Sequence, residues 1–358
     1  MNVKQLIFAS SIAFAISMMG CKKDDPETTN PTTPASGYTN GVFITNEGPY
    51  GTGTGTVSFY SRSNGSVSSD IFNTKNSFPL GNVVQSMEVY NSKGYIVVNN
   101  AGKVEVVDAN SFASVGTITG LTSPRCFLGI TSSKGYISQF GSGATGEVKV
   151  IDLNTNAITG TIATGNGADA MVKVGNTVYV ACSGGFTNDT VVTAIDATTN
   201  AVLTNINTGA NPASMQLDAN GKLWVLCVGK WNSSYTSLVN TGSLVRINPA
   251  TNTVELSLPF ASTTNSPMHL CIDAAKTTLY YLYNGGVYVQ PIAAPSLASA
   301  PLINRGFYSL GYDPTSNAIF AGDAGNFSSN GKVIRYNQAG AVLDSFAAGI
   351  IPGNFCFR

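Results

Sequence analysis

The chain has 358 residues, of which 43% are hydrophobic, so it can bury a large core without a metal or a disulfide framework. Lys plus Arg and Asp plus Glu number 19 each, and only 11% of residues are charged. Because this composition provides no basic surface, nucleic acid and an anionic membrane surface are excluded as expected partners. The 38 glycines favour short strands joined by tight turns.

A secretory signal peptide is predicted for residues 1–20. Lys4 is followed by an apolar run, Leu6 to Met19, which is too short to cross a bilayer as a helix. The run ends at Gly20 and Cys21, a pair that resembles the lipobox of bacterial lipoproteins, although Met18 stands where Leu is usual. The resemblance implies cleavage before Cys21 and acylation of the Cys21 thiol.

Residues 21–40 are predicted to form the acylated cysteine and a disordered tether. The stretch "KKDDPE" after Cys21 resembles the signal that some Gram-negative bacteria use to place lipoproteins on the cell exterior, and a soluble spacer is the alternative. The Pro/Thr-rich stretch from Pro26 to Gly37 has no means of forming a core. We therefore expect an outer-membrane lipoprotein that faces the exterior and contacts the membrane only through its lipid.

A repeated group of strands is predicted after the tether. A hydrophobic triplet with a central aromatic residue is followed by a second strand, such as "GEVKVID" from Gly146, and by a third strand after a turn. The seven central aromatic residues are Phe43, Tyr95, Tyr136, Tyr179, Trp224, Tyr280 and Phe320. Four-stranded units that repeat at about 40 to 50 residues are typical of β-propeller blades.

The two ends of the repeat predict how the fold closes. A further strand, often beginning with Pro, precedes the triplet in six units, but only the tether precedes Val42 in the first. The stretch from Pro352 to Arg358 matches this strand and has no unit after it. We therefore predict an all-β fold over residues 41–358. It is a seven-bladed β-propeller of four-stranded blades, closed by the C-terminal strand, which completes blade one and removes the free edges.

The cysteines and the recurring aspartates are predicted to be structural. Five cysteines after Cys21 lie in apolar strand-like runs, at spacings that fit neither a metal motif nor a complete disulfide framework. We expect buried core residues at Cys126, Cys182, Cys227, Cys271 and Cys356. Aspartates recur at one place in blades two, three and four and are expected to accept backbone N–H groups in turns: Asp108, Asp152 and Asp196.

Few features of the sequence favour catalysis. His269 is the only histidine, so a His-rich metal site is excluded and Ser-His-Asp catalysis would depend on this residue alone. A hydrogen-bonded position in the inner channel is the favoured role of His269, and ligand contact is the alternative. The glycines from Gly51 to Gly55 lack the helix and Lys of a phosphate-binding loop. No enzyme activity, catalytic residue, metal or cofactor is predicted.

Function is expected on one face of the propeller. The loops that join the second and third strands of a blade open on the same side as the loops between blades. They carry aromatic side chains among amides and hydroxyls, which suit a large, amphipathic, weakly charged ligand. In the long blade-five loop from Gly229 to Gly242, packing on a neighbouring blade is the alternative to ligand contact. The candidate ligand-binding residues are Tyr50, Arg125, Phe186, Trp231, Asn232, Tyr235, His269, Arg305 and Phe327.

Three stretches resemble known propellers. Gly41 to Gly51, together with Pro79 to Asp108, resembles the start of the BtuG-type surface lipoproteins that assist vitamin B12 uptake. Thr177 to Pro212 is similar to the repeat of the wider set of YncE-like or YVTN-repeat propellers. The resemblance covers nearly all of residues 41–358 and rests on blade-framework motifs, so it transfers no ligand residue individually. In "NEGPYG", Pro49 stands where Asn is expected.

The resemblance implies a protein that captures cobalamin outside the cell and passes it to a TonB-dependent outer-membrane transporter. Two alternatives remain open. The same face could bind a glycan or a partner protein. A corrinoid is coloured and should co-purify with the protein or shift in absorbance on binding, whereas a glycan would not. An enzyme such as a propeller lactonase or a quinone-dependent dehydrogenase would need a metal ringed by carboxylates or a cofactor pocket, and the inner strands contain few acids.

Overall fold

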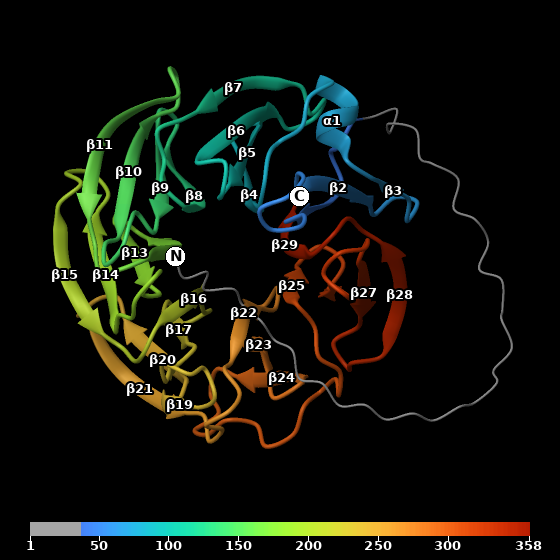
Figure 1. Cartoon of the computed structure of the whole chain (residues 1–358). Helices are drawn as coiled ribbons and strands as arrows, with labels where there is room; N and C mark the ends of the chain where they lie inside the picture. Colours follow the sequence, from blue (N-terminus) through green and yellow to red (C-terminus); the bar gives the residue numbers. More distant parts are fainter. Residues whose placement is uncertain (1–36) are drawn as a thin grey trace, which may run out of the picture. The chain divides into compact units, whose positions relative to one another are not determined.

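The computed structural model describes residues 37–358. The predicted signal peptide, Cys21 and most of the predicted tether lie outside the described residues, so these assignments stay predictions. Seven antiparallel sheets follow one another around a ring, and the inner strand of each contacts the inner strand of the next (Figure 1). This arrangement confirms the predicted seven-bladed propeller. Among the described residues, no helix has the length and apolar character needed to cross a membrane.

Blades one to four each contain four strands. From the inner edge outward, blade one is β29 (Pro352–Phe357), β1 (Gly41–Asn46), β2 (Thr56–Ser61) and β3 (Val67–Ser68); blade two is β4 (Val84–Tyr90), β5 (Lys93–Val98), β6 (Lys103–Asp108) and β7 (Ser114–Ile118); blade three is β8 (Pro124–Thr131), β9 (Lys134–Gln139), β10 (Glu147–Asp152) and β11 (Ala157–Ala163); blade four is β12 (Ala168–Val174), β13 (Thr177–Cys182), β14 (Val191–Asp196) and β15 (Val202–Asn207).

Blades five to seven follow the same order with two departures. Blade five is β16 (Pro212–Leu217), β17 (Leu223–Cys227), β20 (Ser243–Asn248) and β21 (Thr253–Pro259); blade six is β22 (Met268–Ile272), β23 (Thr278–Tyr283) and β24 (Gly286–Pro291); blade seven is β25 (Ser309–Asp313), β26 (Ala318–Asp323), β27 (Lys332–Tyr336) and β28 (Val342–Ala347). Blade six has an isolated bridge between Val287 and Ile303 in place of a fourth strand. The blade-five loop forms its own hairpin from β18 (Lys230–Trp231) and β19 (Leu238–Asn240).

Burial differs between the second and the outermost strands of a blade. All residues of β17 are buried, because the blades on either side cover both faces of the sheet. In contrast, the outermost strand β11 has a single buried residue, Ile162, and exposed residues alternate with half-buried ones along it. The central aromatic residue of blade five, Trp224, is fully buried within β17.

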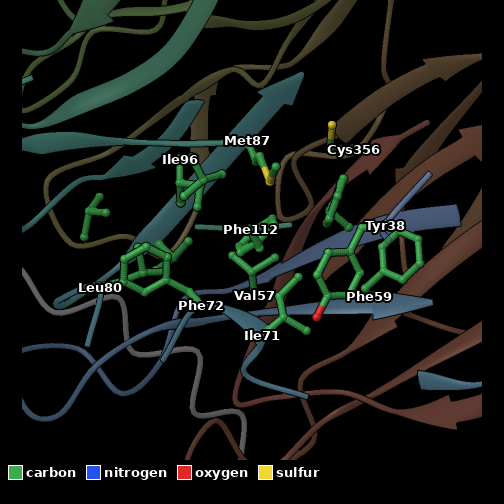
Figure 2. Packing of buried hydrophobic residues seen from close by; sticks show 14 residues of the cluster. Tyr38, Val57, Phe59, Ile71, Phe72, Leu80, Met87, Ile96, Phe112 and Cys356 are labelled. Atoms are coloured by element: carbon green, nitrogen blue, oxygen red, sulfur yellow. The ribbon is translucent and has the colours of Figure 1, made fainter. Parts of the chain in front are cut away.

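An aromatic cluster lies where blades one and two meet. Tyr38, just before β1, packs edge-on against Phe59 at 5.0 Å between ring centroids (Figure 2). The Phe43 ring lies 5.3 Å from the Phe112 ring. The short helix α1 (Ile71–Asn76) adds Phe72 to the same cluster. These rings join the first strand of the propeller to blade two, on the opposite side from blade seven.

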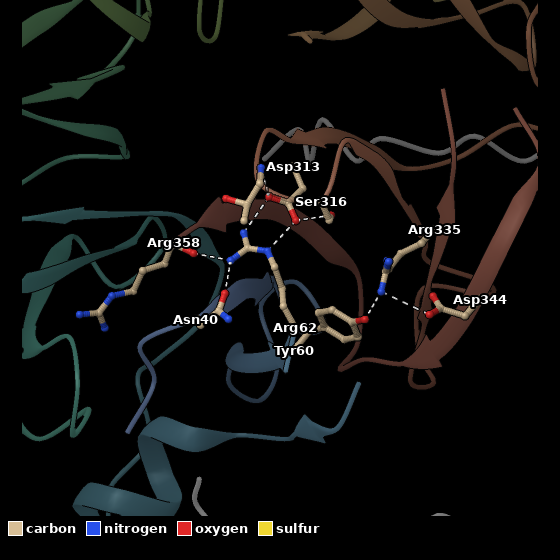
Figure 3. Close-up of polar contacts among 9 residues, drawn as sticks. Asn40, Tyr60, Arg62, Asp313, Ser316, Arg335, Asp344 and Arg358 are labelled. Atoms are coloured by element: carbon tan, nitrogen blue, oxygen red, sulfur yellow. Dashed lines mark hydrogen bonds and ion pairs between the residues drawn. The ribbon is translucent and has the colours of Figure 1, made fainter. Parts of the chain in front are cut away.

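The C-terminal strand closes the ring as predicted. Strand β29 pairs with β1, so that Cys356 lies opposite Phe43, and β29 also contacts β25 of blade seven. A buried ion pair bridges the same seam, because the Arg62 Nε and Nη2 atoms each lie 2.7 Å from an Asp313 carboxylate oxygen (Figure 3). Arg62 also donates to the backbone carbonyl of Arg358 in β29's extension.

The structural roles expected for the aspartates and cysteines are observed. Asp108, Asp152 and Asp196 accept hydrogen bonds from backbone N–H groups two or three residues later, which lower the pKa of all three carboxyls. The cysteines of the described residues form no disulfide, and all are buried except Cys126, which is half-buried. Residues 37–358 contain no cluster of three or more His, Cys, Asp or Glu side chains arranged to hold a metal ion.

Candidate functional site

The inner strands share an irregularity near the face on which the inter-blade loops open, here called the loop face. The pairing of six of them shifts after their first residue. Three of these shifts lie in neighbouring blades, at Val84 of β4, Pro124 of β8 and Ala168 of β12. A bulge of this kind redirects the side chain of the extra residue. The residues that follow the three shifts are Gln85, Arg125 and Asp169.

These side chains come together around Arg125. The Arg125 Nε and Nη2 atoms lie 3.2 Å and 3.4 Å from the two carboxylate oxygens of Asp169, and Nη1 donates to the Gln85 side-chain oxygen at 2.6 Å. The guanidinium also lies 4.5 Å from the centre of the Phe140 ring, a cation–π distance. Ser183 donates to Asp169 at 3.1 Å. Blades two, three and four therefore meet in one polar network.

A second contact, between blades seven and one, lies near enough to this network for the Arg125 charge to act on it. The Tyr308 hydroxyl, just before β25, donates to the Glu47 carboxylate at 2.9 Å, directly after β1. Burial raises the Glu47 pKa, against the hydrogen bond from Tyr308 and the positive charge of Arg125. Gly353 lies below this carboxylate, and a Cβ atom there would come 2.6 Å from it. A Cβ atom at position 353 would therefore require the Glu47 carboxylate to move from this position.

His269 belongs to the same region. Its backbone φ of 54° is in the left-handed range, which is uncommon for a residue other than glycine. Burial lowers its pKa to about 4, against a hydrogen bond to the Tyr308 backbone and the charge of Asp169. His269 is therefore neutral at physiological pH, and its role as an inner-channel residue stays a prediction. We call the following residues the mouth cluster: Glu47, Gln85, Arg125, Asp169, His269 and Tyr308.

Two candidate aromatic residues stand beside the mouth cluster. The Phe186 ring, in the loop after β13, is 51% exposed and packs edge-on against Phe140 at 6.0 Å. The Phe327 ring, in the loop after β26, is 49% exposed and packs edge-on against Tyr308 at 5.6 Å. Each ring thus contacts a residue of the mouth cluster directly or through Phe140, and each keeps half of its surface open.

The remaining candidates lie in other parts of the loop face. Tyr50 in blade one is 72% exposed, and Arg305 pairs with Asp323 at 2.6 Å beside blade seven. Trp231, Asn232 and Tyr235 belong to the β18–β19 hairpin, where Asn232 hydrogen-bonds within its own loop. None of these five has a hydrogen bond, ion pair or ring contact with the mouth cluster within residues 37–358. The nine candidates are therefore divided among separate places.

Four residues of this site were not among the candidates: Glu47, Gln85, Asp169 and Tyr308. Gln85 and Asp169 occupy the same position of the blade as Arg125, the second residue of the inner strand. Aligning the blades would have identified both. Glu47 and Tyr308 are 261 residues apart and give no local signal.

Comparison with known families gives one match. A family model described as a domain of unknown function, DUF5074, matches residues 40–341, which is most of the chain. The chain therefore belongs to this family. No curated protein matches it.

Solved structures share the fold. A quinonprotein alcohol dehydrogenase-like protein from Bacteroides thetaiotaomicron is similar with a TM-score of 0.67 at 15% identity, over 90% of this chain and 79% of that chain. A functionally unknown protein from Desulfotomaculum acetoxidans has a TM-score of 0.65 at 13% identity, over 89% and 99% of the two chains. Kuenenia stuttgartiensis hydrazine synthase has a TM-score of 0.53 at 16% identity, over 73% and 80%. At these identities the similarity establishes the propeller fold alone.

Proposed function

We propose that this DUF5074 propeller is a non-enzymatic, cell-surface lipoprotein that captures cobalamin or another corrinoid on its loop face. The observation that carries the proposal is the pair of half-exposed rings, Phe186 and Phe327, held beside the polar mouth cluster. The BtuG-type and YncE-like resemblance of the sequence supports the choice of ligand.

A corrinoid has the chemistry that this surface would recognise. Its ring system is broad and rigid, so little conformational freedom is lost on binding, and exposed aromatic side chains can cover its apolar surface. Its rim carries amide groups, which can both donate and accept hydrogen bonds. Arg125 and Gln85 offer donors, and Glu47 and Asp169 offer acceptors, at the centre of the loop face.

Delivery follows from the predicted N-terminus. A lipid on Cys21 would hold the propeller at the outer membrane, and the tether would let it reach a TonB-dependent transporter. The position of the mouth cluster on the loop face supports transfer, because a ligand held on a face can be passed to a second protein without crossing the propeller.

Calorimetric titration of cyanocobalamin into the purified protein tests the proposal. We expect one-to-one binding, weakened about tenfold or more in Phe186→Ala and in Phe327→Ala, because each loses apolar contact area. Phe78→Ala is the matched control, since Phe78 is 42% exposed and packs on Phe72 of α1, away from the mouth cluster. Absence of heat at millimolar ligand would reject the corrinoid and leave a glycan or a partner protein.

A further inference from the structure

A polar groove lies between blades four and five. It has a volume of about 680 Å³ and is lined by the loop after β13, the chain between β15 and β16, and the start and end of the β18–β19 hairpin. Its lining residues include Asn188, Asp189, Lys230, Asn240, Thr241 and Ser257. None of the mouth-cluster residues is among them, so the groove is a separate place on the molecule.

The groove depends on a glycine. Gly209 lies between Ser243 and Cys227, and a Cβ atom at position 209 would come 2.6 Å from the Ser243 Oγ atom and 3.2 Å from the Cys227 Sγ atom. Glycine at this position lets the chain between the blades pass close to blade five. The close approach of blades four and five thus forms one wall of the groove, and the loops of these blades form the rest.

Several polar side chains of the groove have unused hydrogen-bonding capacity. Within residues 37–358, no hydrogen bond or ion pair joins the side chains of Lys230, Asn240, Thr241 and Ser257 to other residues. Thr241 is half-buried and the other three are exposed, so all four can reach a ligand from the surface. Asp189, in contrast, is held in place by the backbone N–H groups of Asn166 and Thr190. The groove thus combines one fixed acceptor with free donors and acceptors.

We propose that this groove binds a neutral saccharide. A sugar hydroxyl donates one hydrogen bond and accepts others, so it matches a mixed set of amides, hydroxyls, a carboxylate and an ammonium group. Asp189 and Lys230 are the only charged residues of the lining and have opposite charges, so the groove has no net charge that would favour an anionic or a cationic ligand. An apolar ligand would leave these polar groups desolvated without partners, which is costly. The proposal is independent of the corrinoid proposal, because it concerns other residues.

An immobilised array of neutral, sulfated and sialylated glycans tests the proposal on the purified protein. We expect binding to neutral glycans, weakened at least about tenfold by Ser257→Trp, which would fill the groove from its exposed edge. Thr161→Trp is the matched control, because Thr161 occupies the equivalent position on the outermost strand of blade three and is also exposed. Its binding should equal that of the unmodified protein.

A second variant keeps the test decisive if Ser257→Trp does not fold. Lys230→Met removes an exposed donor from the groove and should weaken binding to the same neutral glycans by about tenfold. Three results would overturn the proposal: no binding to any neutral glycan, binding restricted to sulfated or sialylated glycans, or neutral-glycan binding unchanged in both variants. A negative cyanocobalamin titration would leave it standing.

Discussion

The seam between blades one and seven and the mouth cluster each contain an arginine–aspartate pair, but the two pairs differ in how they are held. At the seam, both Arg62 contacts with Asp313 are 2.7 Å, and the two side chains are 8% and 0% exposed. In the mouth cluster, the Arg125 contacts with Asp169 are 3.2 Å and 3.4 Å, and the side chains are 23% and 13% exposed.

The difference indicates different roles. A short, bidentate, fully buried pair has little reason to break, and it fixes the closure of the ring. A longer pair at a bulge, partly exposed to solvent and shared with Gln85, can exchange a partner for a ligand at a lower cost than the seam pair can. The following substitutions separate a pair that holds the fold from a pair that serves binding.

The largest effect is expected at the seam. Arg62→Met leaves the Asp313 carboxylate buried without its cation, which should lower the free energy of unfolding by about 3–5 kcal/mol in urea denaturation. Cyanocobalamin affinity of the folded variant should not change. A loss below about 1 kcal/mol would show that the seam pair is not needed for closure.

The pH dependence of the same variant adds a check. Burial would raise the Asp313 pKa, but hydrogen bonds from Arg62 and Ser316 and the Arg62 charge lower it below 3.8. A carboxyl with a lowered pKa stabilises the fold above its unfolded pKa, and this contribution is lost as the pH falls through the folded pKa. The stability difference between the protein and Arg62→Met should therefore be complete at pH 7. It should begin to shrink as the pH falls through the Asp313 pKa of the variant, where burial acts without Arg62, and it should shrink further as the pH falls to the lowered pKa of the unmodified protein.

The contrast also explains what the sequence could predict. Closure by Pro352–Phe357 was predictable from the repeat. The first blade lacks the inner strand that the other blades have, and the C-terminal stretch matches that strand. The missing fourth strand of blade six was harder to predict, although Pro295 and Pro301 interrupt the stretch where this strand would lie. The mouth cluster depends on bulges and on contacts between distant blades, so the sequence indicated Arg125 but not its partners.

The next largest effect on stability is expected at Glu88, a buried carboxylate with no ion-pair partner among residues 37–358. Burial raises the Glu88 pKa from 4.5 to about 7, against one hydrogen bond from the Gly129 backbone. The folded protein then holds a proton that the unfolded chain releases, so stability falls as the pH rises from 4.5 to about 7. Glu88→Gln should raise the free energy of unfolding at pH 8 by about 1–3 kcal/mol and leave it unchanged at pH 4. Equal stability of both proteins at pH 8 would contradict this.

A smaller effect on stability is expected at the mouth cluster. Arg125→Met removes a half-buried pair and should lower the free energy of unfolding by about 1 kcal/mol, well below the loss in Arg62→Met. It should also weaken cyanocobalamin binding about tenfold or more, because the central donor is lost. The same titration on Arg62→Met provides the control. If Arg125→Met destabilised the fold as strongly as Arg62→Met, the two pairs would have the same role.

The smallest expected effect on stability is at the blade-five hairpin, which neither pair contacts. Trp231 is half-buried on β18 and lies outside the mouth cluster, so Trp231→Ala should change the free energy of unfolding by less than about 1 kcal/mol. If a bound corrinoid extends from the mouth cluster onto this hairpin, Trp231→Ala weakens cyanocobalamin binding while the protein stays folded. Unchanged affinity would show that the corrinoid contacts only the rings around the mouth cluster. The hairpin would then contribute only to the groove between blades four and five.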